Sequence, residues 1–187
     1  MVSGTGGQEG EGAAAGAGGS GGAGETPAIQ DYYPDDAARC YGCGRLNEAG
    51  HQLRTRWEGE ETVSRFTPEP EHTALPGYVY GGLVASLLDC HGTGTAAGAA
   101  ARADGWEPVS GRAPEGGMPR YVTARLEVDF VAPTPLGPEL VVRGRVVEHT
   151  DRKVVVEETL EADGEVTARG RVVAVRMPES LAGGVEG

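Results

Sequence analysis

Residues 121–130 alternate between apolar and polar side chains. The apolar residues would share one face of an extended segment: Val122, Ala124, Leu126, Val128 and Phe130. The polar ones would share the other: Thr123, Arg125, Glu127 and Asp129. A period of two is typical of a strand with one buried face. Three more strand-like segments follow at 140–150, 153–163 and 165–177, joined by turns at HTDR and ADGE.

Two shorter strand-like segments, 51–59 and 61–69, precede the long apolar stretch and would form a hairpin through EGEE. From Gly81 to about Arg102 the chain instead reads as a single helix. One helix can cover so many strands only if the sheet curls around it. The pattern therefore predicts an α+β fold in which an antiparallel sheet of about five to six strands wraps one long central helix.

Composition sets the domain limits. Residues 1–28 are mainly Gly, Ala, Ser and Glu, with almost nothing to bury, which predicts a disordered tail. We expect one folded domain at 29–178 and a flexible C-terminal tail at 179–187.

The net charge of −12 argues against binding to nucleic acid or to an anionic membrane surface. No apolar run is long enough to span a bilayer. The first residues lack the basic and apolar regions of an export signal, and three cysteines are too few for a disulfide framework. We therefore expect a cytoplasmic protein.

The predicted helix has two unlike faces. One is broad and apolar and should meet the sheet: Leu83, Val84, Leu87, Leu88, Cys90 and His91. The opposite face has small residues around one carboxylate: Gly82, Ala85, Ser86, Asp89, Thr93, Ala96 and Ala100. Solvent-facing helix surfaces usually carry Lys, Glu and Arg, so this strip indicates close approach by a ligand or a second helix. Asp89 is then a candidate general base or nucleophile.

The start of the helix offers hydrogen-bond donors. Pro76 and Gly77 predict a turn, and Gly81 and Gly82 open the helix. The first backbone N–H groups of a helix have no internal partner and lie at the positive end of its dipole. Glycines there would let a carbonyl oxygen approach, as in an oxyanion hole.

Two motifs, PGYVYGGLVASLLDCHG and YVTARLEVDFVAPTPLG, resemble the hotdog-fold thioesterases of the PaaI-like, acyl-CoA-hydrolysing type. CYGCG followed by NEAG is similar to the opening segment of many members, so the resemblance covers roughly residues 39–178. It implies a hotdog fold, hydrolysis of an acyl thioester of coenzyme A or a carrier protein, and a homodimer or homotetramer with active sites between subunits. It implies no cofactor and no metal.

The resemblance also implies roles for single residues. Asp89 corresponds to the catalytic acid, and Gly81 to the glycine whose N–H polarises the thioester carbonyl. Thr123 corresponds to a Ser or Thr that positions water, although alternation puts it on the polar face, so that it needs the start of the strand or a bulge to reach the site. His72 and the residues at the helix start, Tyr80 and Gly82, would shape the substrate site.

Several departures and alternatives stay open. Tyr80 stands where the best-known members have His. Coenzyme A carries phosphates, and Arg152, which ends HTDR, and Lys153, which follows it, resemble the family's basic turn. The other readings are a non-catalytic acyl-thioester-binding or assembly protein on the same fold, and a hotdog hydratase or dehydratase.

Other candidate residues have more ordinary interpretations. Cys40 and Cys43 could be half of a zinc site, but we expect a structural turn, because no second pair exists. Cys90 is expected to point toward the sheet as a small core residue. His91 is expected to be a core histidine.

Overall fold

The computed structural model describes residues 26–107 and 111–178. The N-terminal part contains three short 3-10 helices, η1 (Ile29–Tyr32), η2 (Asp35–Ala37) and η3 (Pro70–His72). Ala28 and Ile29 are fully buried, so the packed chain begins just before residue 29. The rest of the expected N-terminal tail, residues 1–25, and the expected C-terminal tail, residues 179–187, lie outside the described residues.

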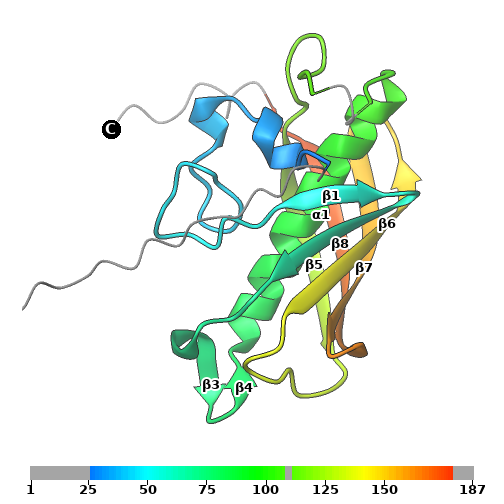
Figure 1. Cartoon of the computed structure of the whole chain (residues 1–187). Coiled ribbons are helices and arrows are strands. Elements are labelled where there is room, and N and C mark those ends of the chain that lie inside the picture. The colour runs from blue at the N-terminus through cyan, green and yellow to red at the C-terminus, as the bar shows by residue number, and fades with distance from the viewer. Residues whose placement is uncertain (1–25, 108–110, 179–187) are drawn as a thin grey trace, which may run out of the picture.

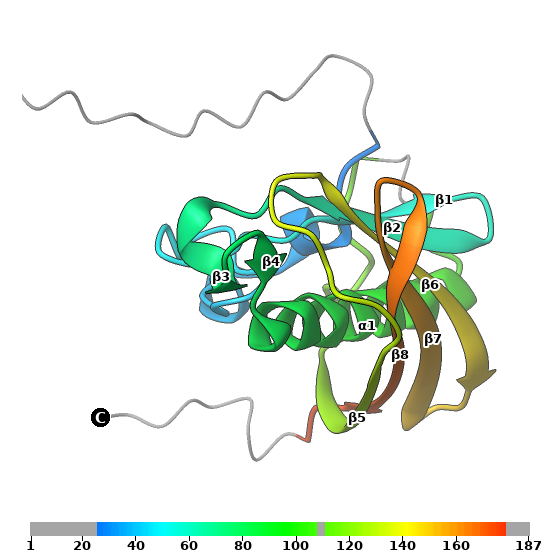
Figure 2. The same cartoon turned by 90° about the horizontal axis from the view of Figure 1, so that it is seen from below.

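One long helix, α1 (Gly81–Ala103), stands against a six-stranded antiparallel sheet of order β1-β2-β6-β7-β8-β5. Its strands are β1 (Thr55–Glu58), β2 (Glu61–Phe66), β5 (Tyr121–Phe130), β6 (Leu140–His149), β7 (Lys153–Ala162) and β8 (Glu165–Arg176). Figure 1 shows the strands crossing α1, and Figure 2 shows β1 and β2 on one side of the helix with β5 on the other. The predicted hotdog architecture is confirmed.

A small second sheet precedes the helix. It is a hairpin of β3 (Thr73–Leu75) and β4 (Tyr78–Val79). The sequence predicted only the turn of this hairpin, not its two strands. Gly77 in this turn has φ of 85°, a conformation that favours glycine over other residues. The hairpin delivers the chain directly into the first turn of α1.

The core follows the apolar face of α1. Leucine and valine side chains from the first half of the helix pack against β6, β7 and β8: Leu83, Val84, Leu87 and Leu88 against Leu140, Val142, Leu160 and Ala168. At Gly92 the helix backbone comes so close to β8 that an added Cβ would lie 2.6 Å from Val172.

The expected small-residue face of α1 is only half correct. Gly82, Ala85, Ser86, Asp89 and Thr93 are half-buried, as an open strip requires. Ala96 and Ala100 are buried instead. Ala96 packs against four residues of β7 and β8: Val154, Val156, Val172 and Ala174. The sheet curls around the helix and covers more of its surface here than a helical wheel with one sheet-facing side predicts.

Strand β5 contains a bulge that reverses its alternation. Thr123 pairs with Ala174 and Arg125 with Val173, so Ala124 is an extra residue. Tyr121 and Leu126 both pack on the core side, with the irregularity between them. Val122 and Ala124 therefore do not share a face with Leu126 and Val128, in contrast to the strict alternation read from the sequence.

Candidate active site

Asp89 and Thr123 meet between α1 and β5. Asp89 lies in the first half of α1 and is half-buried. Its Oδ1 accepts a hydrogen bond from the Thr123 hydroxyl. The bulge at Ala124 makes this contact possible, because it turns Thr123 toward the helix. The sequence predicted both residues, with a bulge as one of two routes for Thr123.

The start of α1 presents free backbone donors. Tyr80 caps the helix in an extended conformation without a side-chain hydrogen bond, and its carbonyl accepts from the N–H groups of Leu83 and Val84. Among the described residues, none accepts a hydrogen bond from the N–H of Gly81 or Gly82. These two groups lie at the positive end of the helix dipole, where a developing oxyanion would be stabilised.

Tyr80 shapes the same helix end. Its ring lies over Gly82, so closely that an added Cβ would be 2.3 Å from ring atom Cζ. The ring remains 58% exposed. Gly82 therefore provides the space in which the Tyr80 side chain rests beside the donors.

An apolar groove of about 610 Å³ runs beside Gly81. Its walls come from the β3–β4 hairpin, the first turn of α1 and the segment after β5, with Leu75, Tyr78, Val84, Phe130 and Val131 among the lining residues. Leu75, Phe130 and Val131 are each more than half exposed. The groove has the size and character that an acyl chain requires.

His72 supports the approach to the helix. Its Nδ1 accepts a hydrogen bond from the Glu69 N–H at 2.8 Å, and its carbonyl accepts one from the Tyr80 N–H at 2.8 Å. Its ring packs edge-on against His51 and Phe66. These contacts orient the segment that leads to Gly81.

The predicted basic residues lie elsewhere. Arg152 and Lys153 are at the turn between β6 and β7, and Lys153 pairs with Glu148 at 2.8 Å. Lys153 lies level with Val175 of β8, whereas Phe130, next to Gly81, lies level with Ala168. That separation is seven residues along β8, or roughly 20 Å. Within one chain, the structure does not bring Arg152 and Lys153 to Gly81.

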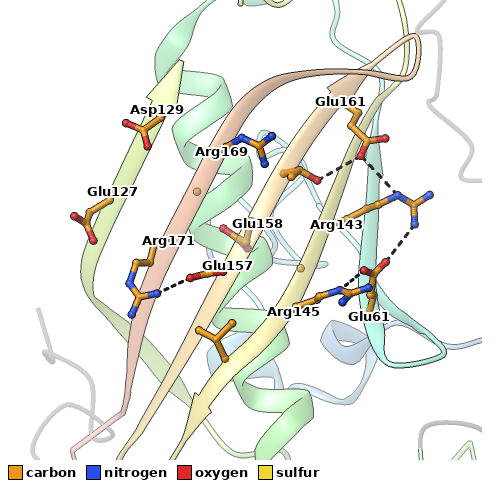
Figure 3. A pocket seen from close by; sticks show the side chains of 14 residues that line it. Glu61, Glu127, Asp129, Arg143, Arg145, Glu157, Glu158, Glu161, Arg169 and Arg171 are labelled. Atoms are coloured by element: carbon orange, nitrogen blue, oxygen red, sulfur yellow. Dashed lines mark hydrogen bonds and ion pairs between the residues drawn. The ribbon is translucent and has the colours of Figure 1, made fainter. Parts of the chain in front are cut away.

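The arginines on the face of the sheet opposite α1 are largely paired. A groove of about 570 Å³ lies there, and Figure 3 shows its charged side chains with the helix behind the strands. Arg143 and Arg145 pair with Glu61, and Arg171 pairs with Glu157 at 2.9 Å. This mixed surface does not resemble a phosphate site built from unpaired cations.

His91 is a core residue, as expected. It is completely buried, with Nδ1 2.8 Å from the Ser64 hydroxyl and Nε2 3.1 Å from the Thr62 hydroxyl. Burial lowers the pKa of His91 to about 3, so the ring is neutral at physiological pH.

Glu158 is a buried carboxyl group that sequence reasoning missed. It lies on β7 between Gly144 of β6 and Gly170 of β8, and it faces α1. Neither carboxyl oxygen has a hydrogen-bond partner among the described residues. Burial, and secondly the Asp89 carboxylate, raise the pKa of Glu158 well above its usual range. The sequence did contain a signal for this burial, because Glu158 alternates with Val156 and Leu160 on the apolar face of its strand.

Three thiols meet beside the turn of α1 that carries Asp89 and Cys90. Cys40 and Cys43 come from the loop before β1, and Cys90 from α1; their sulfur atoms all lie within 4.8 Å of one another. Cys90 is a small core residue, as expected, but its sulfur contacts this loop at Cys40 and Gly42. Hydrogen bonds from Cys43 and Cys90 lower the pKa of Cys40, whereas the pKa values of Cys43 and Cys90 are raised.

Comparison with known proteins decides the family. The sequence profile of the thioesterase superfamily matches residues 76–169, which include the helix, Asp89 and Thr123. The chain is also 46% identical to a thioesterase superfamily protein from Shewanella loihica, over 77% of this chain and 98% of that one, with a TM-score of 0.58. This protein belongs to the thioesterase superfamily.

More distant structures share the fold. A thioesterase from Haemophilus influenzae is 11% identical with a TM-score of 0.56, and covers 72% of this chain and 85% of its own. A Ralstonia eutropha protein related to phenylacetic acid degradation is 18% identical with a TM-score of 0.51, over 67% and 85%. No curated protein sequence matches the chain. None of the described helices is long and apolar enough to cross a membrane.

Membership in the thioesterase superfamily supports hydrolysis of an acyl thioester as the reaction class. It also makes a thioester the substrate class.

Proposed function

We propose that this thioesterase-superfamily protein hydrolyses an acyl thioester of coenzyme A or a carrier protein, as PaaI-like enzymes do, with Asp89 as the general base or nucleophile. The observation that carries this proposal is the hydrogen bond from Thr123 to Asp89. One carboxylate oxygen is held by Thr123, which leaves the other free to take a proton from water or to attack a carbonyl carbon.

The Gly81 N–H is the proposed oxyanion donor. It begins the helix and has no acceptor among the described residues. A thioester carbonyl in the apolar groove would accept this hydrogen bond, and the bond would strengthen as negative charge develops on the oxygen. The thiolate that departs is a good leaving group, because thiols are far more acidic than alcohols.

One chain cannot supply both groups to one carbonyl. Gly81 and Asp89 are eight residues apart on the same helix, which is about 12 Å along its axis. A homodimer resolves this if the Asp89 of one subunit faces the Gly81 of the other. The half-buried strip of α1 and the unpaired edge of β5 are surfaces that such a partner could cover.

Substitution of Asp89 tests the chemistry. Free thiol would be measured as it is released from a panel of acyl-CoAs, because hydration leaves the thioester intact whereas hydrolysis does not. We expect Asp89→Asn to remove turnover and Asp104→Asn, an exposed carboxylate at the other end of α1, to retain it. Turnover that persists in Asp89→Asn would overturn the assignment, and binding without turnover in the wild type would favour an acyl-binding protein.

Substitution of Gly81 tests the donor. Proline is well accepted at the first position of a helix, and the extended Tyr80 backbone suits a following proline. Gly81→Pro deletes the N–H, whereas Gly81→Ala keeps it, and in both the new Cβ would lie 3.4 Å from the Phe130 ring. We expect a loss of ~100- to 1,000-fold in kcat for proline and a much smaller loss for alanine. Equal losses would show that the N–H is not the oxyanion donor.

A further inference from the structure

The three cysteine sulfurs are spaced as metal ligands. The sulfur atoms of Cys40 and Cys90 are 3.8 Å apart, and all three lie within 4.8 Å of one another. A tetrahedral ion with Zn–S bonds of about 2.3 Å needs ligand sulfurs ~3.8 Å apart. A disulfide would need about 2.05 Å. The observed distance fits an ion between the sulfurs.

The loop that carries Cys40 and Cys43 is shaped around the third thiol. An added Cβ at Gly42 would lie 2.2 Å from the Cys90 sulfur, so only glycine lets the loop pass over it. The Gly44 N–H donates to the Cys40 carbonyl at 2.8 Å, which closes a tight turn over the Cys-x-x-Cys segment. The N–H groups of Leu53 and His51 donate to the carbonyls of Gly42 and Tyr41 and hold the loop from behind.

The cluster is open to solvent on the side of Cys40. Cys40 is exposed while Cys43 and Cys90 are buried, so an ion has a route to the sulfurs from solvent.

We propose that Cys40, Cys43 and Cys90 form a three-thiolate site for Zn²⁺. Sulfur ligands suit zinc, and three protein ligands leave one tetrahedral position for water. Binding exchanges the three thiol protons for the ion, and no oxidant or reductant takes part. The site ties the 40–44 loop to the turn of α1 that carries Asp89. This departs from the sequence-based expectation of a plain structural turn, and it does not depend on the proposed hydrolysis.

The test uses the full chain, reduced with a phosphine so that no thiol competes for metal. Co²⁺ serves as the spectroscopic probe, because thiolate coordination gives a charge-transfer band in the near ultraviolet. We expect the band to saturate at one Co²⁺ per chain and to disappear when Zn²⁺ is added. Zn²⁺ should also protect all three thiols from a chromogenic thiol reagent and raise the thermal midpoint.

Two variants decide whether these cysteines are the ligands. Cys40→Ser changes an exposed residue and should fold normally, yet it should weaken Zn²⁺ binding by more than ~10-fold. His149→Ala, an exposed imidazole at the end of β6, should bind as the wild type does. The proposal is overturned if Co²⁺ gives no charge-transfer band, if Zn²⁺ leaves the thiols reactive, or if Cys40→Ser binds Zn²⁺ as tightly as the wild type.

Discussion

The Thr123 hydroxyl donates a hydrogen bond to Asp89 across the gap between strand β5 and helix α1. The two residues are 34 positions apart in the chain. Their contact depends on the bulge at Ala124, which turns Thr123 away from the polar face of its strand. A single inserted residue thus places a hydroxyl beside the carboxylate that we propose to be catalytic.

Removal of this hydroxyl should slow hydrolysis without unfolding the protein. Thr123→Val keeps the shape of the side chain and deletes the donor. A hydrogen bond to a charged group is worth about 1.5–3 kcal/mol, so we expect kcat/KM to fall roughly 10- to 100-fold. Thr123→Ser keeps the hydroxyl and should restore most of the rate. Equal rates in the valine and serine variants would mean that the hydroxyl has no part in the reaction.

A mixed dimer should report whether two chains share one site. Alone, Asp89→Asn should have no turnover and Gly81→Pro should be slower by ~100- to 1,000-fold. If Gly81 of one subunit works with Asp89 of the other, a hybrid of the two variants contains one intact site and one doubly altered site. We expect co-refolded mixtures to recover activity, up to half of the wild-type rate for a pure hybrid. A hybrid confirmed by mass spectrometry but devoid of activity would contradict a shared site.

His91 should make the fold sensitive to acid. Its pKa is about 3 in the folded chain and ~6.5 when unfolded, so the unfolded state binds more protons below pH ~6.5. The contribution of His91 is complete above that pH and is lost as the pH falls toward 3, by up to about 1.4 kcal/mol per pH unit. Denaturant unfolding at several pH values would measure it. His91→Gln should flatten the slope in this window, whereas His149→Ala should leave it unchanged.

Glu158 should act in the opposite direction. Burial raises its pKa in the folded chain, so the folded state holds a proton that the unfolded state releases above pH ~4.3. Stability should therefore fall as the pH rises above that value. Glu158→Gln should gain stability relative to the wild type at pH 8 and show little difference at pH 4. Glu157→Gln, the exposed neighbour, is the control. An unchanged pH slope in Glu158→Gln would show that Glu158 does not titrate with unfolding.

Much of the fold could be predicted from the sequence, because apolar residues repeat every two positions in the long strands and about every 3.6 positions in the helix. The central helix, the hairpin of β1 and β2, and the four later strands were all predicted from these patterns. The bulge was not located, because Ala124 looks like an ordinary member of the alternation. The burial of Ala96 also escaped prediction, since it depends on how tightly the sheet curls.

The sequence likewise predicted some residues of the candidate site and missed others. Asp89 was conspicuous as a lone carboxylate among small residues, and Gly81 followed from the physics of helix ends. The contact of Cys90 with Cys40 could not be read, because it joins residues 50 positions apart through an irregular loop. The burial of Glu158 was not predicted, because its side chain lies between Gly144 and Gly170 of the two neighbouring strands. That arrangement appears only when the pairing of the three strands is known.

The glycines inside α1 affect how the protein unfolds locally. Gly92, Gly94 and Gly98 together cost the isolated helix about 3 kcal/mol relative to alanine. In the folded chain each lies against a neighbouring element, where an added Cβ would be 2.6 to 2.7 Å from another residue. The helix is therefore held in shape by its surroundings and should not persist without them. Amide protons of α1 should exchange together with those of β7 and β8, so that loosening of those strands would also remove the support of Asp89, the carboxylate that we propose to be catalytic.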